Sequence, residues 1–279
     1  MIPPEFDYVR VSSVEEAVSV LAADEEAKLL AGGHSLVPLM KLRLAAPTQL
    51  VDIGRVPGLD AIERSNGDWR IGALARHAQL QDRPDMGLAS RVAASIADQQ
   101  VRNRGTIGGS LAHGDPASDL PAVLLACEGR VVARGTGGER EIAAADFFRD
   151  YLTTALEPSE VVTEIRLPAL EGWGFAHRKF TRRAEDWAMV GVCVAVQAEG
   201  GVCRDVRIGF TNMGSTPLRA TATEEALRGQ PLEAASIERA AAQAAEGTDP
   251  PADLNATPEY KRHLARVLTG RALREAAGL

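Results

Sequence analysis

With 279 residues, the chain is long enough to bury a hydrophobic core and to hold a large cofactor, in one large domain or two ordinary ones. Hydrophobic residues make up 45% and charged residues 25% of the chain, proportions that exclude a disordered or fibrous protein. The net charge of -7 disfavours a nucleic-acid partner, although the runs 102–104 and 178–183 are locally basic.

The first unit, residues 1–57, is predicted to contain short helices and strands. The expected elements are, in chain order, a helix from residue 14, a strand over 27–31, a helix over 36–42 and a strand over 50–53. Ser12 and Ser13 precede an acidic turn, which is typical of a helix start. The first strand leads into Gly32-Gly33, and Ser35 is expected to cap the second helix.

A second, larger unit is expected over residues 58–171. Its expected elements are a strand over 69–73, a helix over 89–97, a helix over 119–126 and strands over 130–132 and 161–167. The polar segment 98–105 leads into Thr106-Ile107-Gly108-Gly109-Ser110, which we interpret as a second double-glycine turn. Asp119 is expected to cap the helix that follows, with Pro121 near its start.

From residue 172 onward the pattern changes, and we take 172–279 as a third unit. Its expected elements are strands over 175–180, 189–197 and 206–210, followed by Ala-rich helices around 222–246 and 258–277. No stretch of the chain approaches the roughly 18 consecutive apolar residues of a membrane span. The first seven residues also lack the features of a signal peptide, so a cytoplasmic protein is expected.

The three cysteines are expected to be core residues. Cys127, Cys193 and Cys203 lie far apart and form no C-x-x-C pair. This spacing argues against a disulfide framework, a zinc site and an iron–sulfur cluster held by this chain.

Two glycine-rich segments carry the strongest chemical signal. Both Ala31-Gly32-Gly33-His34-Ser35 and the segment 106–110 end in a hydroxyl residue. Glycine admits positive φ and has no Cβ, so successive backbone N–H groups can point at one anion. Ser35, Thr106 and Ser110 would add side-chain hydrogen bonds. Two such turns on different units suit a diphosphate between them, although neither fits the Rossmann or P-loop pattern.

The residues by themselves leave three alternatives open. Each double glycine could be a tight turn with no ligand. The segment His113–Asp119 contains His and Asp, which are suitable ligands for zinc or non-haem iron. A Ser-His-Asp triad could be assembled from Ser110, His113 and Asp119, but no G-x-S-x-G elbow is present.

At these segments the chain resembles the medium, FAD-binding subunits of the carbon monoxide dehydrogenase and xanthine dehydrogenase group of molybdenum hydroxylases. The segment Lys28–Leu36 is similar to the family's first flavin loop, and Gln100–Ser110 is similar to its second. Asp115–Pro121 follows in the family's order, and the resemblance extends through Arg182-Arg183. It covers most of the chain, while the last 60 residues are similar only in general character.

The resemblance implies an α+β fold: a two-part FAD-binding domain of the vanillyl-alcohol oxidase type, then a smaller α+β domain. The two glycine segments would contact the FAD diphosphate, and Asp119 its sugar or phosphate region. Lys28 and Val162 would line the adenine and flavin ends, while Lys179 and Trp187 would lie at the flavin ring. The full set of implied FAD contacts is Lys28, Leu30, Ala31, Gly32, Gly33, His34, Ser35, Leu36, Thr106, Ile107, Gly108, Gly109, Ser110, Asp119, Val162, Lys179 and Trp187.

The resemblance also implies a place in an electron relay. A large molybdenum subunit would hydroxylate the substrate, a small subunit would pass electrons through two [2Fe-2S] clusters, and the FAD of this chain would deliver them to an external acceptor. A bulky Trp187 over the flavin ring would favour a quinone over NAD as that acceptor. Two other functions stay open: a self-sufficient FAD oxidoreductase of the same fold, and a non-catalytic nucleotide-binding or assembly module.

Overall fold

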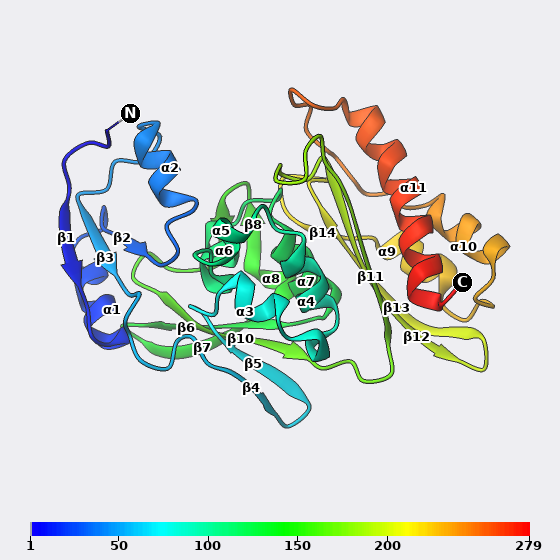
Figure 1. The fold of residues 1–279 in the computed structure, drawn as a ribbon, viewed down its shortest axis with the longest axis horizontal. Coiled ribbons are helices and arrows are strands. Elements are labelled where there is room, and N and C mark those ends of the chain that lie inside the picture. Colours follow the sequence, from blue (N-terminus) through cyan, green and yellow to red (C-terminus); the bar gives the residue numbers. More distant parts are fainter. Residues whose placement is uncertain (1) are drawn as a thin grey trace.

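The computed structural model describes residues 2–279, and its N-terminal, middle and C-terminal parts follow one another from left to right in Figure 1. The N-terminal part is a three-stranded sheet in the order β1-β3-β2, with parallel pairing throughout. Its elements are β1 (Asp7–Arg10), α1 (Val14–Ala23), β2 (Lys28–Leu30), α2 (Leu36–Lys41) and β3 (Gln49–Asp52). Ser13 caps α1 as predicted, since its hydroxyl accepts a hydrogen bond from the Glu16 N–H at 3.1 Å.

The middle part is built on an antiparallel five-stranded sheet in the order β4-β5-β10-β6-β7. These strands are β4 (Ile62–Ser65), β5 (Asp68–Gly72), β6 (Arg130–Gly135), β7 (Gly138–Ala143) and β10 (Val161–Pro168). The helices are α3 (His77–Gln81), the 3-10 turn Pro84–Met86, α4 (Leu88–Ala94), α5 (Gln99–Arg102), α6 (Ile107–His113), α7 (Asp119–Ala126) and α8 (Ala144–Phe147). A small ribbon of β8 (Phe148–Asp150) and β9 (Thr153–Thr154) completes this part. Every residue of α7 is buried, so this helix lies at the centre of the molecule.

The C-terminal part is an antiparallel four-stranded sheet with helices on its outer side (Figure 1). The strands are β11 (Gly174–Phe180), β12 (Val190–Glu199), β13 (Val202–Thr211) and β14 (Leu218–Arg219); the helices are α9 (Thr221–Leu227), α10 (Ala234–Ala241) and α11 (Pro258–Ala277). Two strand glycines allow close helix packing: a Cβ on Gly174 would collide with the Ala276 carbonyl of α11, and one on Gly209 with the Ala122 carbonyl of α7. The sheet therefore lies between α11 and α7.

Several sequence-based predictions of local structure are wrong. The expected turn at 106–110 is the cap and first part of helix α6, and the short helix α5 in the polar segment before it was not predicted. Ser35 precedes α2 but makes no side-chain capping bond, and the residue before α7 is Ser118 rather than Asp119. The helices expected around 222–246 are present as α9 and α10, and the chain turns between them at Gly229, where φ is +77°.

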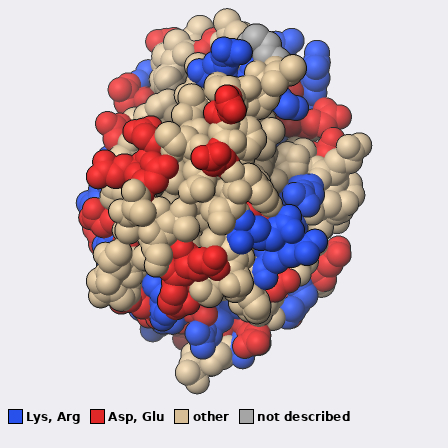
Figure 2. All heavy atoms as spheres, turned by 90° about the vertical axis from the view of Figure 1, so that its left-hand side faces the viewer, with Lys and Arg blue, Asp and Glu red and all other residues tan. Residues whose placement is uncertain are grey.

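The remaining findings concern the cysteines and the surface. All three cysteines are free and buried, as predicted from their spacing. No helix within residues 2–279 is both long and apolar enough to cross a membrane. Figure 2 shows the face turned toward the left of Figure 1, where acidic and basic groups both occur and a compact basic group lies beside uncharged residues.

Candidate functional site

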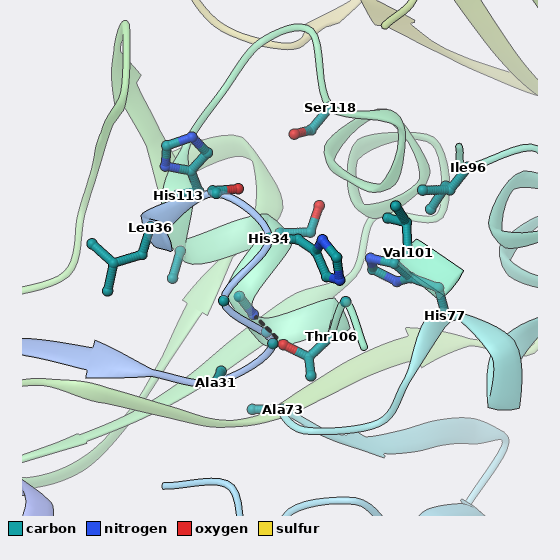
Figure 3. A pocket seen from close by; sticks show the side chains of 18 of the residues that line it. Ala31, His34, Leu36, Ala73, His77, Ile96, Val101, Thr106, His113 and Ser118 are labelled. Carbon is teal, nitrogen blue, oxygen red and sulfur yellow. Dashed lines mark hydrogen bonds between the residues drawn. The ribbon is translucent and has the colours of Figure 1, made fainter. Parts of the chain in front are cut away.

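A cavity of about 550 Å³ is lined by segments of the N-terminal, middle and C-terminal parts (Figure 3). The segment between β2 and α2 forms one wall, and α5, the start of α6 and the start of α7 form another. Strand β10 contributes Val162, and the C-terminal part contributes Lys179 and the segment Glu185–Trp187. This volume is in the range that protein sites use for small molecules and cofactors.

The two glycines of the first segment have different structural roles: Gly32 allows a close backbone contact, and Gly33 adopts a positive φ. A Cβ on Gly32 would lie 2.5 Å from the Arg104 carbonyl oxygen and 2.9 Å from the Gly105 Cα, so only glycine lets the two segments touch. Gly33 has φ of +77°, a conformation that side chains other than glycine's rarely adopt. The backbone of this segment thus reaches the cavity surface without a side chain in front of it.

The second glycine segment is the opening of α6. The Thr106 hydroxyl caps this helix by accepting a hydrogen bond from the Gly109 N–H at 3.2 Å (Figure 3). A Cβ on Gly108 would lie 2.5 Å from the Ala73 Cβ, so Gly108 lets α6 pack closely against the residues that follow β5. Gly109 is different, since apart from the Thr106 hydroxyl at 2.8 Å its Cβ would meet only the Ala31 Cβ at 3.9 Å.

A buried ion pair forms part of the cavity lining. Lys179 Nζ lies 2.8 Å from Asp119 Oδ2, and the exposed fractions of the two side chains are 9% and 7%. The same ammonium group is 3.5 Å from the Ser95 carbonyl oxygen. Burial raises the pKa of Asp119, and the charge of Lys179 opposes that rise. Asp119 Oδ1 is buried without a hydrogen-bond partner in the described residues, so this oxygen can accept a bond from a ligand.

Three histidines line the cavity, and burial lowers the pKa of each. For His77 burial brings the pKa to about 4, with smaller contributions from His34 and Arg102. For His34 the other contributions are Arg104, which lowers the pKa, and Asp98, which raises it. For His113 the Asp115 carboxylate partly opposes the effect of burial. All three are therefore neutral near pH 7.

The mouth of the cavity carries Trp187, whose exposed fraction is 57%. It follows Glu185 and Asp186, which also line the cavity. The segment is anchored at its end, because the Asn212 side-chain amide donates to the carbonyls of Ala188 and Met189 at 2.9 and 3.1 Å. The indole thus stands at the opening rather than in the core.

Most residues predicted for the site do line this cavity. They are Lys28, Ala31, Gly32, Gly33, His34, Ser35, Leu36, Thr106, Gly108, Gly109, Ser110, Asp119, Val162, Lys179 and Trp187. Leu30 and Ile107 do not. The Leu30 side chain lies against Gly33, while Ile107 is buried in the core of the middle part.

Sequence reasoning missed other lining residues, among them His77, Ile96 and Val101. These lie outside both glycine segments. The bridge between Arg76 and Thr106 is what brings His77 to the cavity, and a contact between such distant residues leaves no local pattern.

Comparison with protein families gives two matches that together span nearly the whole chain. Residues 4–170 match the FAD binding domain in molybdopterin dehydrogenase. Residues 175–276 match the CO dehydrogenase flavoprotein C-terminal domain.

Individual relatives are similar over nearly their full lengths. The carbon monoxide dehydrogenase medium chain of Hydrogenophaga pseudoflava is 41% identical, covering 99% of this chain and 98% of the relative. The 6-hydroxypseudooxynicotine dehydrogenase complex subunit alpha of Paenarthrobacter nicotinovorans is also 41% identical, covering 99% and 96%. Among solved structures, quinoline 2-oxidoreductase from Pseudomonas putida 86 matches with a TM-score of 0.95 at 31% identity, covering 100% of this chain and 99% of that one.

Proposed function

Because the chain belongs to the FAD-binding medium subunits of the carbon monoxide dehydrogenase and xanthine dehydrogenase group of molybdenum hydroxylases, we propose that it takes electrons from a partner's [2Fe-2S] cluster and passes them to an external acceptor. The chain is thus an oxidoreductase subunit with a two-domain FAD-binding fold, and FAD is its cofactor. Bound FAD supplies the redox chemistry, while the protein binds it, orients it and controls what reaches it.

The observation that carries this proposal is the arrangement of both glycine segments on one cavity. Gly33 and Gly109 expose backbone toward the same space, and a diphosphate needs donors on two sides. The unpartnered Asp119 oxygen adds an acceptor in the same cavity that Lys28 lines. The residues present therefore fit a long cofactor with a charged centre, and we assign FAD contacts to the lining residues named above.

The mouth residues determine which acceptor can approach. We place the flavin ring at the end of the cavity where Lys179 and Trp187 lie. A nicotinamide must lie flat on the ring for hydride transfer, and an indole at the opening obstructs that approach. A quinone can take electrons at the ring edge, so we propose a quinone rather than NAD as the acceptor.

The partners and the substrate follow from the same family membership. Relatives are medium chains or named subunits of larger enzymes, so we propose a large molybdenum subunit and a small [2Fe-2S] subunit as partners. The names of the relatives refer to substrates as different as carbon monoxide and 6-hydroxypseudooxynicotine. We therefore place the substrate pocket on the molybdenum subunit.

Two measurements test the proposal. The purified chain should show flavin absorbance, and untagged partners that co-purify with it should contain molybdenum and iron. Its flavin should be reduced by substrate only when those partners are present. Reduction of the isolated chain by a small molecule would favour the self-sufficient oxidoreductase, and absence of flavin would favour a module without redox activity.

A further inference from the structure

Two imidazoles meet at the point where the glycine segments approach each other (Figure 3). His34 belongs to the first segment, and its ring is near enough to His77 to affect the pKa of that residue. His77 begins α3, and its N–H donates to the Gly105 carbonyl at 3.1 Å. A Cβ on Gly105 would lie 2.6 Å from His77 Cδ2, so the ring rests against the start of the second segment.

One ring nitrogen of the His77 side chain, Nδ1, has no hydrogen-bond partner within the described residues. Only 5% of the residue is exposed, yet Nδ1 has no partner in the described residues and the ring lines the cavity. A buried polar atom without a partner costs free energy unless a ligand or water satisfies it. Because the His77 residue lines the cavity, a ligand that enters there and shifts the ring slightly can supply this partner.

The groups that face the two imidazoles are mostly cationic. Arg102 donates to the carbonyls of Ile96 and Ala97 at 2.7 and 3.0 Å, and Arg76 donates to the Arg104 carbonyl at 2.6 Å. Arg102 also donates to the Gln99 side-chain oxygen at 3.2 Å, and neither arginine forms an ion pair with another group of residues 2–279. Asp98 is the acid that acts on His34, and its carboxylate already accepts the Val101 N–H at 2.8 Å.

The cavity has other ionisable groups as well. They are Lys28, His113, Asp119, Glu160, Lys179, Glu185 and Asp186. Asp119 and Lys179 neutralise each other, and the charged groups that act on the pKa of His34 or His77 are Arg102, Arg104 and Asp98 rather than the other acids of the cavity. An anion that binds here meets positive charge and two imidazoles that are free to take up protons.

We propose that His34 and His77 form a proton-linked anion site, in which binding of the FAD diphosphate recruits a proton to the imidazole pair. This inference rests on the proposed function, because it requires FAD in this cavity. The proton stays at an imidazole nitrogen while the anion is bound and returns to solvent when the anion leaves. No bond of the cofactor is made or broken.

The direction of the pH effect follows from linkage. In the free chain the pKa of His77 is about 4, so the ring is neutral at neutral pH. A bound anion raises the pKa of the pair above its value in the free chain. Affinity for FAD is therefore greatest at low pH and is lost as the pH rises through the pKa of the bound state. For one proton we expect FAD to bind about tenfold more tightly near pH 5.5 than near pH 7.5.

Titration calorimetry of the full-length chain, stripped of flavin and refilled with FAD, tests this directly. Titrations near pH 6 in two buffers of different ionisation enthalpy should give different heats, from which uptake of about one proton follows. Equal heats in the two buffers would overturn the inference while leaving FAD binding intact. Failure of the chain to bind FAD at all would overturn the proposed function and, with it, the inference.

Variants then locate the proton. His34→Gln and His77→Gln keep a hydrogen-bonding side chain but cannot be protonated, so the double variant should bind FAD without proton uptake. His263→Gln removes an exposed histidine of α11 outside the cavity and should keep the uptake of the parent. Undiminished uptake in the double variant would contradict the assignment. Because buried His77 could matter for folding, thermal unfolding of each variant accompanies the titrations.

Discussion

Gly108 and Gly109 are neighbours in the chain but have different surroundings, and this difference separates folding from cofactor binding. We expect Gly108→Val to lower the free energy of unfolding by about 1–3 kcal/mol or more, because its side chain would meet Ala73. Gly109→Val projects toward the cavity, so it should lose FAD at a smaller cost in stability. Flavin content and thermal unfolding measure the two effects. Full FAD occupancy in Gly109→Val would refute the role of the second segment.

The ion pair with Asp119 reduces the effect that Lys179 can have on the midpoint potential of the flavin. A lone cation beside the flavin would raise its midpoint potential, but here the carboxylate 2.8 Å away offsets part of that charge. Lys179→Met should lower the potential by on the order of 30 mV, equivalent to about 1.4 kcal/mol for a two-electron couple. Asp119→Asn should raise it. Shifts of the same sign in the two variants would rule out an electrostatic role.

Trp187 offers a direct test of acceptor choice. After anaerobic chemical reduction, the parent should be reoxidised rapidly by a soluble quinone and slowly by NAD. Trp187→Ala opens the mouth and should increase the rate with NAD by about tenfold or more, as the loss of one blocking contact allows. Trp173→Ala is the matched control, since its indole packs under Arg207 and does not line the cavity. Rapid NAD reduction by the parent would show that Trp187 is not an obstacle.

Site residues could be predicted where they form local patterns. The glycine segments are recognisable because each joins a glycine needed for close packing, Gly32 or Gly108, to a glycine beside the cavity, Gly33 or Gly109. His77 and Val101 could not be found this way, since tertiary contacts bring them to the cavity. The pairing of Lys179 with Asp119 was equally hidden, because it joins residues far apart in the chain.

Helix α7 links the cavity to the C-terminal sheet, and Gly209 allows this contact. A Cβ on Gly209 would strike the Ala122 carbonyl of α7, while one on Gly174 would strike Ala276 of α11. We expect Gly209→Ala and Gly174→Ala each to cost about 1–3 kcal/mol of stability. Only Gly209→Ala should also disturb Asp119, at the first turn of α7, and so change the flavin spectrum. If the flavin spectra of the two variants are identical, a displacement of α7 at Ala122 does not reach Asp119.

The sequence predicted the elements with a clear apolar period and missed those without one. Strands β5, β10 and β12 were expected because they are apolar and buried. Strand β7 was missed because it lies at a sheet edge and most of its residues are exposed. Helix α6 was missed because two glycines lower its helix propensity, and the buried Thr106 cap and tertiary packing compensate.

The division into units at residues 57 and 171 remains a proposal. It is supported by the separate three-, five- and four-stranded sheets. The cores are not fully separate, since Cys193 of β12 belongs to the core of the middle part and Val161 of β10 to that of the N-terminal part. We therefore expect cooperative unfolding rather than three independent transitions.

Stability of the whole molecule should fall in mild acid because of buried histidines. Burial lowers the pKa of His177 from 6.5 to about 4, and His77 has the same depressed value. Their contribution to stability is complete above pH 6.5 and is lost as the pH falls toward 4. Between pH 6.5 and pH 4, each histidine should lower the free energy of unfolding by about 3 kcal/mol.

Chemical denaturation at a series of pH values checks this expectation. The slope of unfolding free energy against pH should decrease in His177→Gln, which cannot be protonated. His263→Gln should keep the slope of the parent, because that side chain is exposed. An unchanged slope in His177→Gln would exclude His177 as a source of the acid sensitivity.

Residues from different parts of the chain line the cavity, and this has an evolutionary consequence. The two glycine segments precede residue 111, whereas Lys179 and Trp187 belong to the C-terminal part. Retention of the cofactor and choice of its oxidant are thus encoded in separate stretches of the gene. Recombination that replaces only the 3′ half of the gene would change the residues that select the electron acceptor. The two glycine segments would be inherited unchanged.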